Sequence, residues 1–187
     1  MNKAYTYSIP ELKERYRNAD KQIRLYEDKP TDLILFKLSE STWNIREVAE
    51  HLTAFGRLYL RQINKAITEQ SPLPQAGGPF QPRWIYKKWA VFFEPPYKFK
   101  MKTFPLMEPK DEKEVNSTFD ALHEFQNKII DLLAQAEKSR WNLEKIKGRN
   151  PLFRILPMSL IEFLVLIEVH QRRHFWQIEQ ILKKIGE

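Results

Sequence analysis

Apolar residues recur along most of this 187-residue chain with the period of an amphipathic helix, and the alternation typical of strands is almost absent. This pattern predicts four long helices, which we place at about residues 8–27, 44–70, 117–137 and 159–185. A shorter helical stretch is expected at 32–38. Four amphipathic helices of this length predict an all-α protein built as a four-helix bundle.

The predicted helix ends carry residues that are typical of helix caps. At three of the starts, a Ser or Asn is followed three positions later by Glu, as in a capping box: Ser8 and Glu11, Asn44 and Glu47, Ser159 and Glu162. Gly186 follows the last helix, where a residue in the left-handed conformation commonly ends a helix. The fourth helix therefore has both its beginning and its end marked in the sequence.

The longest connection, residues 71–109, separates the second and third long helices. Its first part is rich in proline and holds a Gly-Gly pair, which predicts a surface loop. A short helix is expected at 83–93, before a pair of prolines, so this insertion is proline-rich and partly helical. A second connection covers 142–157. The sequence contains no internal repeat and no domain linker, so residues 1–187 are predicted to form a single domain.

The chain has no cysteine, which excludes disulfides, a thiolate nucleophile of its own and cysteine-ligated metals. Its net charge of +7 and pI of about 9.5 raise nucleic acid as a partner. Lysines and arginines are mixed with acids along every predicted helix, however, so no nucleic-acid partner is expected. No apolar run is long enough for a bilayer and the first residues lack a signal-peptide core, so we expect a cytoplasmic protein without a membrane partner.

The densest basic and aromatic stretch is 83–89, at the start of the predicted short helix. Its rings could stack on bases or line a pocket mouth, but we favour an amphipathic helix with a solvated cationic face. Exposed aromatic residues between Trp84 and Phe93 would also suit an interface between two copies of the chain. A homodimer is therefore one expectation.

Two of the four histidines, His170 and His174, lie four residues apart inside the apolar stripe of the fourth helix. At this spacing both rings lie on one helix face, where two imidazoles can bind one metal ion. His51 lies between Val48 and Phe55 in the stripe of the second helix, so it also points inward. Three such rings would form a site with an open fourth position, which is typical of catalytic rather than structural zinc.

Two other interpretations of these histidines stay open at this point. A pair spaced by four residues arises by chance in a minority of chains with this histidine content. Buried imidazoles can also be polar core residues that hydrogen-bond to protein acceptors. The remaining histidine, His123, flanks the apolar stripe of the third helix and has the position of a boundary residue rather than a ligand.

Two sequence blocks carry a resemblance to a known family. STWNIREVAEHL, residues 41–52, resembles the Trp-Ser-x-x-Glu-x-x-x-His-Leu signature of the DinB-like (damage-inducible) superfamily, and HQRRHFWQIEQI, residues 170–181, resembles its C-terminal His-x-x-x-His-x-x-Gln-Ile signature. The resemblance implies an up-down-down-up four-helix bundle that holds a divalent metal on three histidines, here His51, His170 and His174. Relatives include bacillithiol transferases and mycothiol-dependent isomerases, although the 71–109 insertion is less usual in the family.

A site of three neutral imidazoles would leave the full charge on the ion, and its nitrogen ligands suit Zn²⁺ or Ni²⁺. Our leading hypothesis is a metal-dependent transferase that lowers the pKa of an external low-molecular-weight thiol, its co-substrate, for attack on a small-molecule electrophile. The alternatives are a metal-assisted hydrolase and a non-catalytic, stress-associated metal-binding bundle.

Five residues near the ligands complete the set of candidates. Glu47 could accept the second ring N–H of a ligand, although its place in a capping box indicates a structural role. Gln177 could orient a ligand or reach the open metal position. Arg173 would either serve an anionic substrate or, more commonly for arginine, be solvated, while Trp43 and Trp176 are expected to contribute packing.

Overall fold

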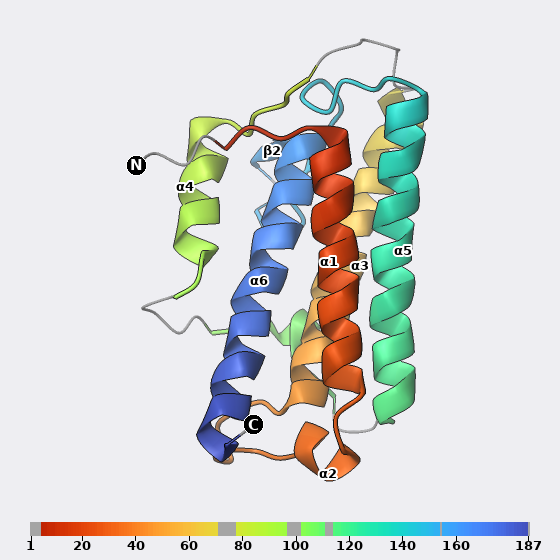
Figure 1. The fold of residues 1–187 in the computed structure, drawn as a ribbon. Helices are drawn as coiled ribbons and strands as arrows, with labels where there is room; N and C mark the ends of the chain where they lie inside the picture. The colour runs from red at the N-terminus through yellow and green to blue at the C-terminus, as the bar shows by residue number, and fades with distance from the viewer. Residues whose placement is uncertain (1–4, 71–77, 97–101, 111–113, 154, 187) are drawn as a thin grey trace.

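Four long helices form the body of the protein (Figure 1). In the computed structural model, the described residues are 5–70, 78–96, 102–110, 114–153 and 155–186. The long helices are α1 (Ile9–Glu27), α3 (Ile45–Gln70), α5 (Val115–Lys138) and α6 (Leu160–Ile185). The shorter elements are α2 (Thr31–Ile34), α4 (Trp84–Phe93), the 3-10 helix η1 (Pro105–Met107) and the strands β1 (Lys147–Arg149) and β2 (Pro157–Ser159). The predicted four-helix bundle is confirmed.

The helices have the up-down-down-up order, because α1 and α6 run in one direction and α3 and α5 in the other (Figure 1). α1 packs against α5, and α3 packs against both α5 and α6. Since α3 and α5 are consecutive long helices that run in parallel, the chain must return along the whole length of the bundle between them. The long connection after α3 is thus a requirement of this topology.

The predicted caps are present at the starts of α3 and α6. Asn44 Oδ1 accepts from the backbone N–H of Glu47 at 2.8 Å, and the Glu47 carboxylate accepts from the N–H of Asn44 at 2.9 Å. At α6, the Glu162 carboxylate accepts from the N–H of Ser159 at 2.7 Å. Gly186 follows α6 in the left-handed conformation, with a φ of 85°. These local signals explain why both helices begin where the sequence predicts.

Two connections differ from the prediction. The helix expected at 32–38 is shorter, since α2 covers Thr31–Ile34. The connection after α5 contains β1, which pairs antiparallel with β2 so that Gly148 lies opposite Met158. Strands of three residues are too short to show an alternating pattern, which is why this ribbon was not predicted. A Cβ at Gly148 would lie 3.1 Å from Phe163 and 3.2 Å from Ala66, so glycine lets the ribbon lie close to the bundle.

α4, the helix predicted at 83–93, packs along α6 and is held at both ends by ion pairs. Just before α4, Arg83 Nε donates to Glu162 at 2.7 Å, and just after it Glu94 accepts from Arg172 at 2.6 and 2.8 Å. The side chain of Glu162 is fully buried, so one carboxylate both caps α6 and holds the start of α4. Residues 71–77 and 97–101 of the predicted insertion lie outside the described residues.

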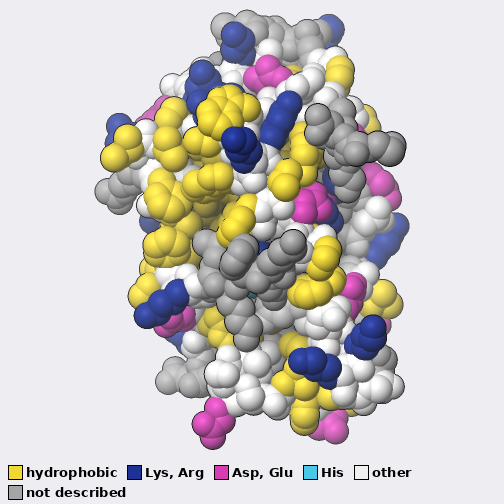
Figure 2. Space-filling view, turned by 90° about the vertical axis from the view of Figure 1, so that its left-hand side faces the viewer, with side chains coloured by type: hydrophobic (Ala, Val, Ile, Leu, Met, Phe, Trp, Pro, Cys, Tyr) yellow, Lys and Arg dark blue, Asp and Glu magenta, His cyan; other side chains and the backbone are white. Residues whose placement is uncertain are grey.

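The outward face of α4 is apolar. Trp84, Val91 and Phe92 are 68%, 57% and 46% exposed, and Figure 2 shows apolar side chains gathered over this part of the surface with lysine and arginine side chains among them. A homodimer through this face remains a prediction. Among the helices that the structure describes, none combines the length and the apolar character that a bilayer crossing requires.

Gly56 provides a test of how tightly α3 and α5 pack. A Cβ at this position would lie 2.6 Å from two ring atoms of Phe125, which is itself only 2% exposed. Overpacking of this kind costs about 1–3 kcal/mol, against a gain in helix propensity of about 1 kcal/mol. Gly56→Ala should therefore lower the free energy of unfolding, measured in urea, by up to about 2 kcal/mol. In the double variant Gly56→Ala/Phe125→Leu, the free energy of unfolding should fall by less than the sum of the falls in the two single variants. Strictly additive falls would contradict the contact between position 56 and Phe125.

Candidate metal centre

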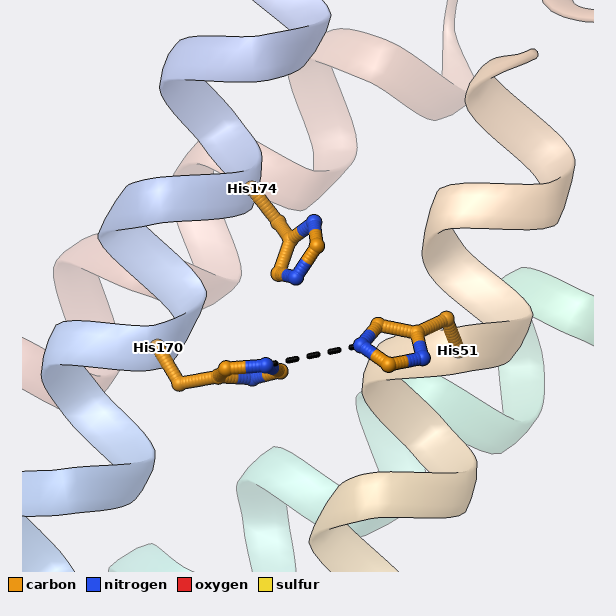
Figure 3. A group of neighbouring side chains, drawn as sticks. All are labelled: His51, His170 and His174. Carbon is orange, nitrogen blue, oxygen red and sulfur yellow. Dashed lines mark hydrogen bonds between the residues drawn. The ribbon is translucent and has the colours of Figure 1, made fainter. Parts of the chain in front are cut away.

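Three histidine rings meet between α3 and α6 (Figure 3). His170 and His174 project from α6 one turn apart, and His51 projects toward them from α3. All three residues are buried. Their positions in the apolar stripes therefore bring them together, as predicted from helical periodicity.

The spacing of the ring nitrogens fits one metal ion. One nitrogen from each ring lies within 4.8 Å of the other two, and the Nε2 atoms of His51 and His170 are 3.4 Å apart. Two nitrogens bound to a tetrahedral ion at about 2.0–2.1 Å are separated by about 3.3 Å. The His51–His170 distance is thus already that of two ligands of the same ion.

Hydrogen bonds on the outer side orient two of the rings. His51 Nδ1 donates to the backbone carbonyl of Met107 in η1 at 2.9 Å, and His174 Nδ1 donates to Gln177 Oε1 at 3.0 Å. A proton held on Nδ1 leaves the Nε2 lone pair for a metal, which is the usual arrangement around histidine ligands. The two rings are therefore set in the tautomer that metal binding requires.

His170 is held in a different way, by aromatic packing. Its ring stacks on Phe55, with centroids 3.8 Å apart and planes 14° apart, and it makes an edge-to-face contact with Phe93, with centroids 5.7 Å apart. Its buried Nδ1 has no hydrogen-bond partner among the described residues. Leaving a buried polar nitrogen unpaired is costly, so gaining a metal at the opposite nitrogen would compensate for part of the cost of burying this ring.

Burial keeps the three imidazoles neutral. It lowers the pKa of His51 below its ordinary value, and the hydrogen bond to Met107 only partly opposes this. Burial also lowers the pKa of His170 and His174 well below the ordinary value, and the neighbouring histidines and, to a lesser extent, Arg173 add to this effect. The hydrogen bond to Gln177 partly opposes it at His174. Neutral imidazole is the form that binds metal, so the rings are ready to do so at neutral pH.

The rings open onto a cavity of about 320 Å³. One part of its wall is apolar and aromatic and is formed by Trp43, Phe55, Phe93, Phe104, Met107 and Leu152. Another part is polar and is formed by Ser41, Thr42, Thr103, Arg173 and Gln177. A buried histidine cluster that faces a cavity of this size has room for a small-molecule ligand beside it.

Comparison with known proteins places the chain in a family. The sequence model of the DinB superfamily matches residues 11–178. The chain belongs to the DinB superfamily. Among solved structures it is similar to YfiT from Bacillus subtilis, described as "a probable metal-dependent hydrolase with an unusual four-helix bundle topology". The TM-score is 0.60 and the identity 14%, over 95% of this chain and 87% of that one, so the likeness shows a shared fold. No curated protein matches the chain.

In this DinB protein, Glu47 and Gln177, the two polar candidates next to the histidines, have different environments. The Glu47 carboxylate accepts from the backbone of Asn44 and from Lys37 Nζ at 2.6 Å, which are the bonds of a helix cap and an ion pair. The acceptor for His51 is instead the carbonyl of Met107. Gln177 does orient a ring, that of His174.

The other candidates also divide between the site and the rest of the bundle. Arg173 is 6% exposed and lines the cavity, so the solvated position expected for it was wrong. Trp43 lines the same cavity and stacks near His174, with centroids 6.3 Å apart. Trp176 lines a separate cavity between α1 and α6. His123 lies outside the cluster, where its two ring nitrogens contact Asp20 and Glu27.

Several functional positions were missed by sequence reasoning because they come from the connection after α3. Met107 contributes a backbone carbonyl, which leaves no trace in the side-chain pattern. Phe93 and Phe104 form part of the cavity wall from α4 and from the segment before η1. The run of aromatic residues in this connection was a signal, but its distance in sequence from the histidines concealed its place in the site.

Lowering the pH should destabilise the metal-free protein. In the unfolded chain the three histidines bind protons near pH 6.5, whereas burial lowers the pKa of each in the folded state. Between pH 6.5 and the lower folded values the unfolded chain holds more protons, so the free energy of unfolding falls by up to about 1.4 kcal/mol per pH unit for each histidine. Urea unfolding at pH 7 and pH 5 with a chelator measures this loss. In a His51→Asn variant the free energy of unfolding should fall less between pH 7 and pH 5. A fall equal to that of the wild type would contradict the conclusion that the buried His51 contributes to it.

Proposed function

We propose that this protein is a metal-dependent enzyme that holds one divalent ion on His51, His170 and His174. The observation that carries the proposal is the meeting of three buried imidazoles at the wall of a cavity. Nitrogen ligands alone favour Zn²⁺ or Ni²⁺, and three protein ligands leave a position for a substrate. Such an ion, when bound, lowers the pKa of a water or thiol that coordinates to it.

The reaction that these surroundings support best is transfer of an external thiol to an electrophile. Among the described residues that line the cavity there is no Asp or Glu. Hydrolysis of most esters and amides benefits from a group that transfers a proton to the leaving atom, whereas a thiolate needs only to be formed and directed. The protein contains no cysteine, so the thiol has to be a small molecule from solution.

The two acidic residues on the same stretch of α3 are engaged in other contacts, which weakens the case for hydrolysis. Glu47 is held by Asn44 and Lys37, as described above. Glu50 accepts from Arg46 at 3.2 Å and from the backbone N–H of Lys110 at 3.2 Å. Metal-assisted hydrolysis, the activity named for YfiT, is the alternative function.

The chain's own residues would have distinct roles in thiol transfer. Met107 and Gln177 orient His51 and His174 through their outer nitrogens. The aromatic wall near Trp43 and Phe104 binds the apolar part of a substrate and limits the access of water. Thiol and electrophile would thus be held together in one small, largely apolar space, which favours their reaction.

Removing one histidine tests the metal site. His51→Ala should purify with less than one tenth of the metal bound by the wild type, because two imidazoles and an open site bind weakly. Metal content by plasma mass spectrometry and melting temperature with and without a chelator are the measurements. His123→Ala is the matched control, since it removes a histidine outside the cluster and should keep the metal. Equal metal contents in the wild type and His51→Ala would refute the site.

The reaction is tested with a generic electrophile such as 1-chloro-2,4-dinitrobenzene and a panel of thiols that includes bacillithiol, mycothiol, glutathione and cysteine. We expect conjugation above the uncatalysed rate only with metal-loaded protein, and a loss of at least about tenfold in His51→Ala. Inactivity with every thiol, combined with turnover of ester or amide substrates, would assign the hydrolase instead. Metal binding without either activity would indicate a non-catalytic bundle.

A further inference from the structure

Two consecutive arginines of α6 have separate environments. Arg172 donates to both carboxylate oxygens of Glu94, at 2.6 and 2.8 Å, and to Glu168 at 2.7 Å. These bonds join the end of α4 to α6, so Arg172 is a structural residue. Arg173 instead lines the cavity of the three histidines.

The neighbours of Arg173 place its guanidinium beside the candidate metal centre. Its central carbon lies 5.6 Å from the centre of the Phe93 ring, and the centre of that ring lies 5.7 Å from the centre of the His170 ring. The position of Phe93 is itself fixed, because the next residue, Glu94, is held by Arg172. Arg173 is thus positioned over an aromatic face, which is a common way to hold a guanidinium in place for ligand binding.

Among the described residues that line the cavity, the side-chain charge is of one sign. Arg173 is permanently positive, the three imidazoles are neutral, and a divalent ion would add two more positive charges. No Asp or Glu is found among the described residues of the cavity wall. A small cavity with low-dielectric aromatic walls and charge of one sign attracts ligands of the opposite sign.

We propose that Arg173 binds a carboxylate of the thiol co-substrate and so selects carboxylate-bearing thiols over neutral ones. The choice of thiol as the ligand rests on the proposed function, whereas the recognition of a carboxylate by Arg173 does not depend on turnover. The planar guanidinium suits a carboxylate because it can donate two parallel hydrogen bonds. The rest of the ligand would contact the aromatic wall formed by Trp43 and Phe104.

The first experiment compares two thiols that differ in one group, 3-mercaptopropionate and 3-mercaptopropanol, in the conjugation assay. The wild type should prefer the carboxylate in kcat/KM by about 10- to 100-fold, as for a charge-assisted hydrogen-bonded pair. Arg173→Gln should lose most of this preference, and Arg173→Lys should retain part of it. Arg61→Gln, which removes an exposed arginine of α3, should leave it unchanged. A preference that survives in Arg173→Gln would overturn the inference.

The second experiment does not need turnover. Benzoate and benzyl alcohol are titrated calorimetrically into zinc-loaded wild type, Arg173→Lys and Arg173→Gln, with metal content and melting temperature measured for each. We expect benzoate to bind the wild type at least about tenfold more tightly than Arg173→Gln, and benzyl alcohol to bind both alike. Because all three proteins hold the metal, the difference in benzoate affinity reports the contribution of Arg173.

Together, the two experiments distinguish failure of the proposed thiol transfer from failure of carboxylate binding by Arg173. If no thiol is turned over but benzoate binding still depends on Arg173, the thiol transferase is rejected and the carboxylate site stands. If thiols react but benzoate binds the wild type and Arg173→Gln equally, the function stands and the role of Arg173 is rejected. If Arg173→Gln does not fold, Arg173→Lys replaces it in the comparison. Equal benzoate affinity in the wild type and Arg173→Lys would then reject binding of the carboxylate through two parallel hydrogen bonds from the guanidinium.

Discussion

The packing of α6 against α3 is the interaction on which the rest of the structure depends. It buries three imidazoles at one contact, and burial of polar rings is unfavourable unless each nitrogen finds a partner. Outer hydrogen bonds satisfy two rings, and aromatic packing holds the third. The inner nitrogens are left facing one another, with the Nε2 atoms of His51 and His170 3.4 Å apart, so the fold places three ring nitrogens where one cation could contact them all.

The connection after α3 forms part of the cavity wall and is attached to α6. The topology requires a long return between two parallel helices, and this chain uses that length to build the wall of the site. α4 is fixed to α6 by Glu162 at one end and by Arg172 at the other. Because both contacts are to α6, α4 and its wall residue Phe93 are attached to the helix that carries two of the three histidines.

The bundle and the direction of the histidines could be predicted from the sequence because both follow from local rules. Cap residues such as Asn44 and Ser159 set where α3 and α6 begin, and the helical period then determines that His51, His170 and His174 face inward. The Met107 carbonyl and the inward position of Arg173 could not be predicted in this way. They depend on the path of a long connection, which is decided by tertiary packing rather than by periodicity.

The bond from His51 to Met107 also bears on how such a site can change during evolution. The acceptor is a main-chain oxygen, so any residue at position 107 that preserves the turn of η1 supplies it equally well. The side chains of the same connection are then released from the task of supporting the ligands and can vary with the molecule in the cavity. Phe93 and Phe104, two wall residues of that connection, can therefore change without loss of the acceptor that orients His51.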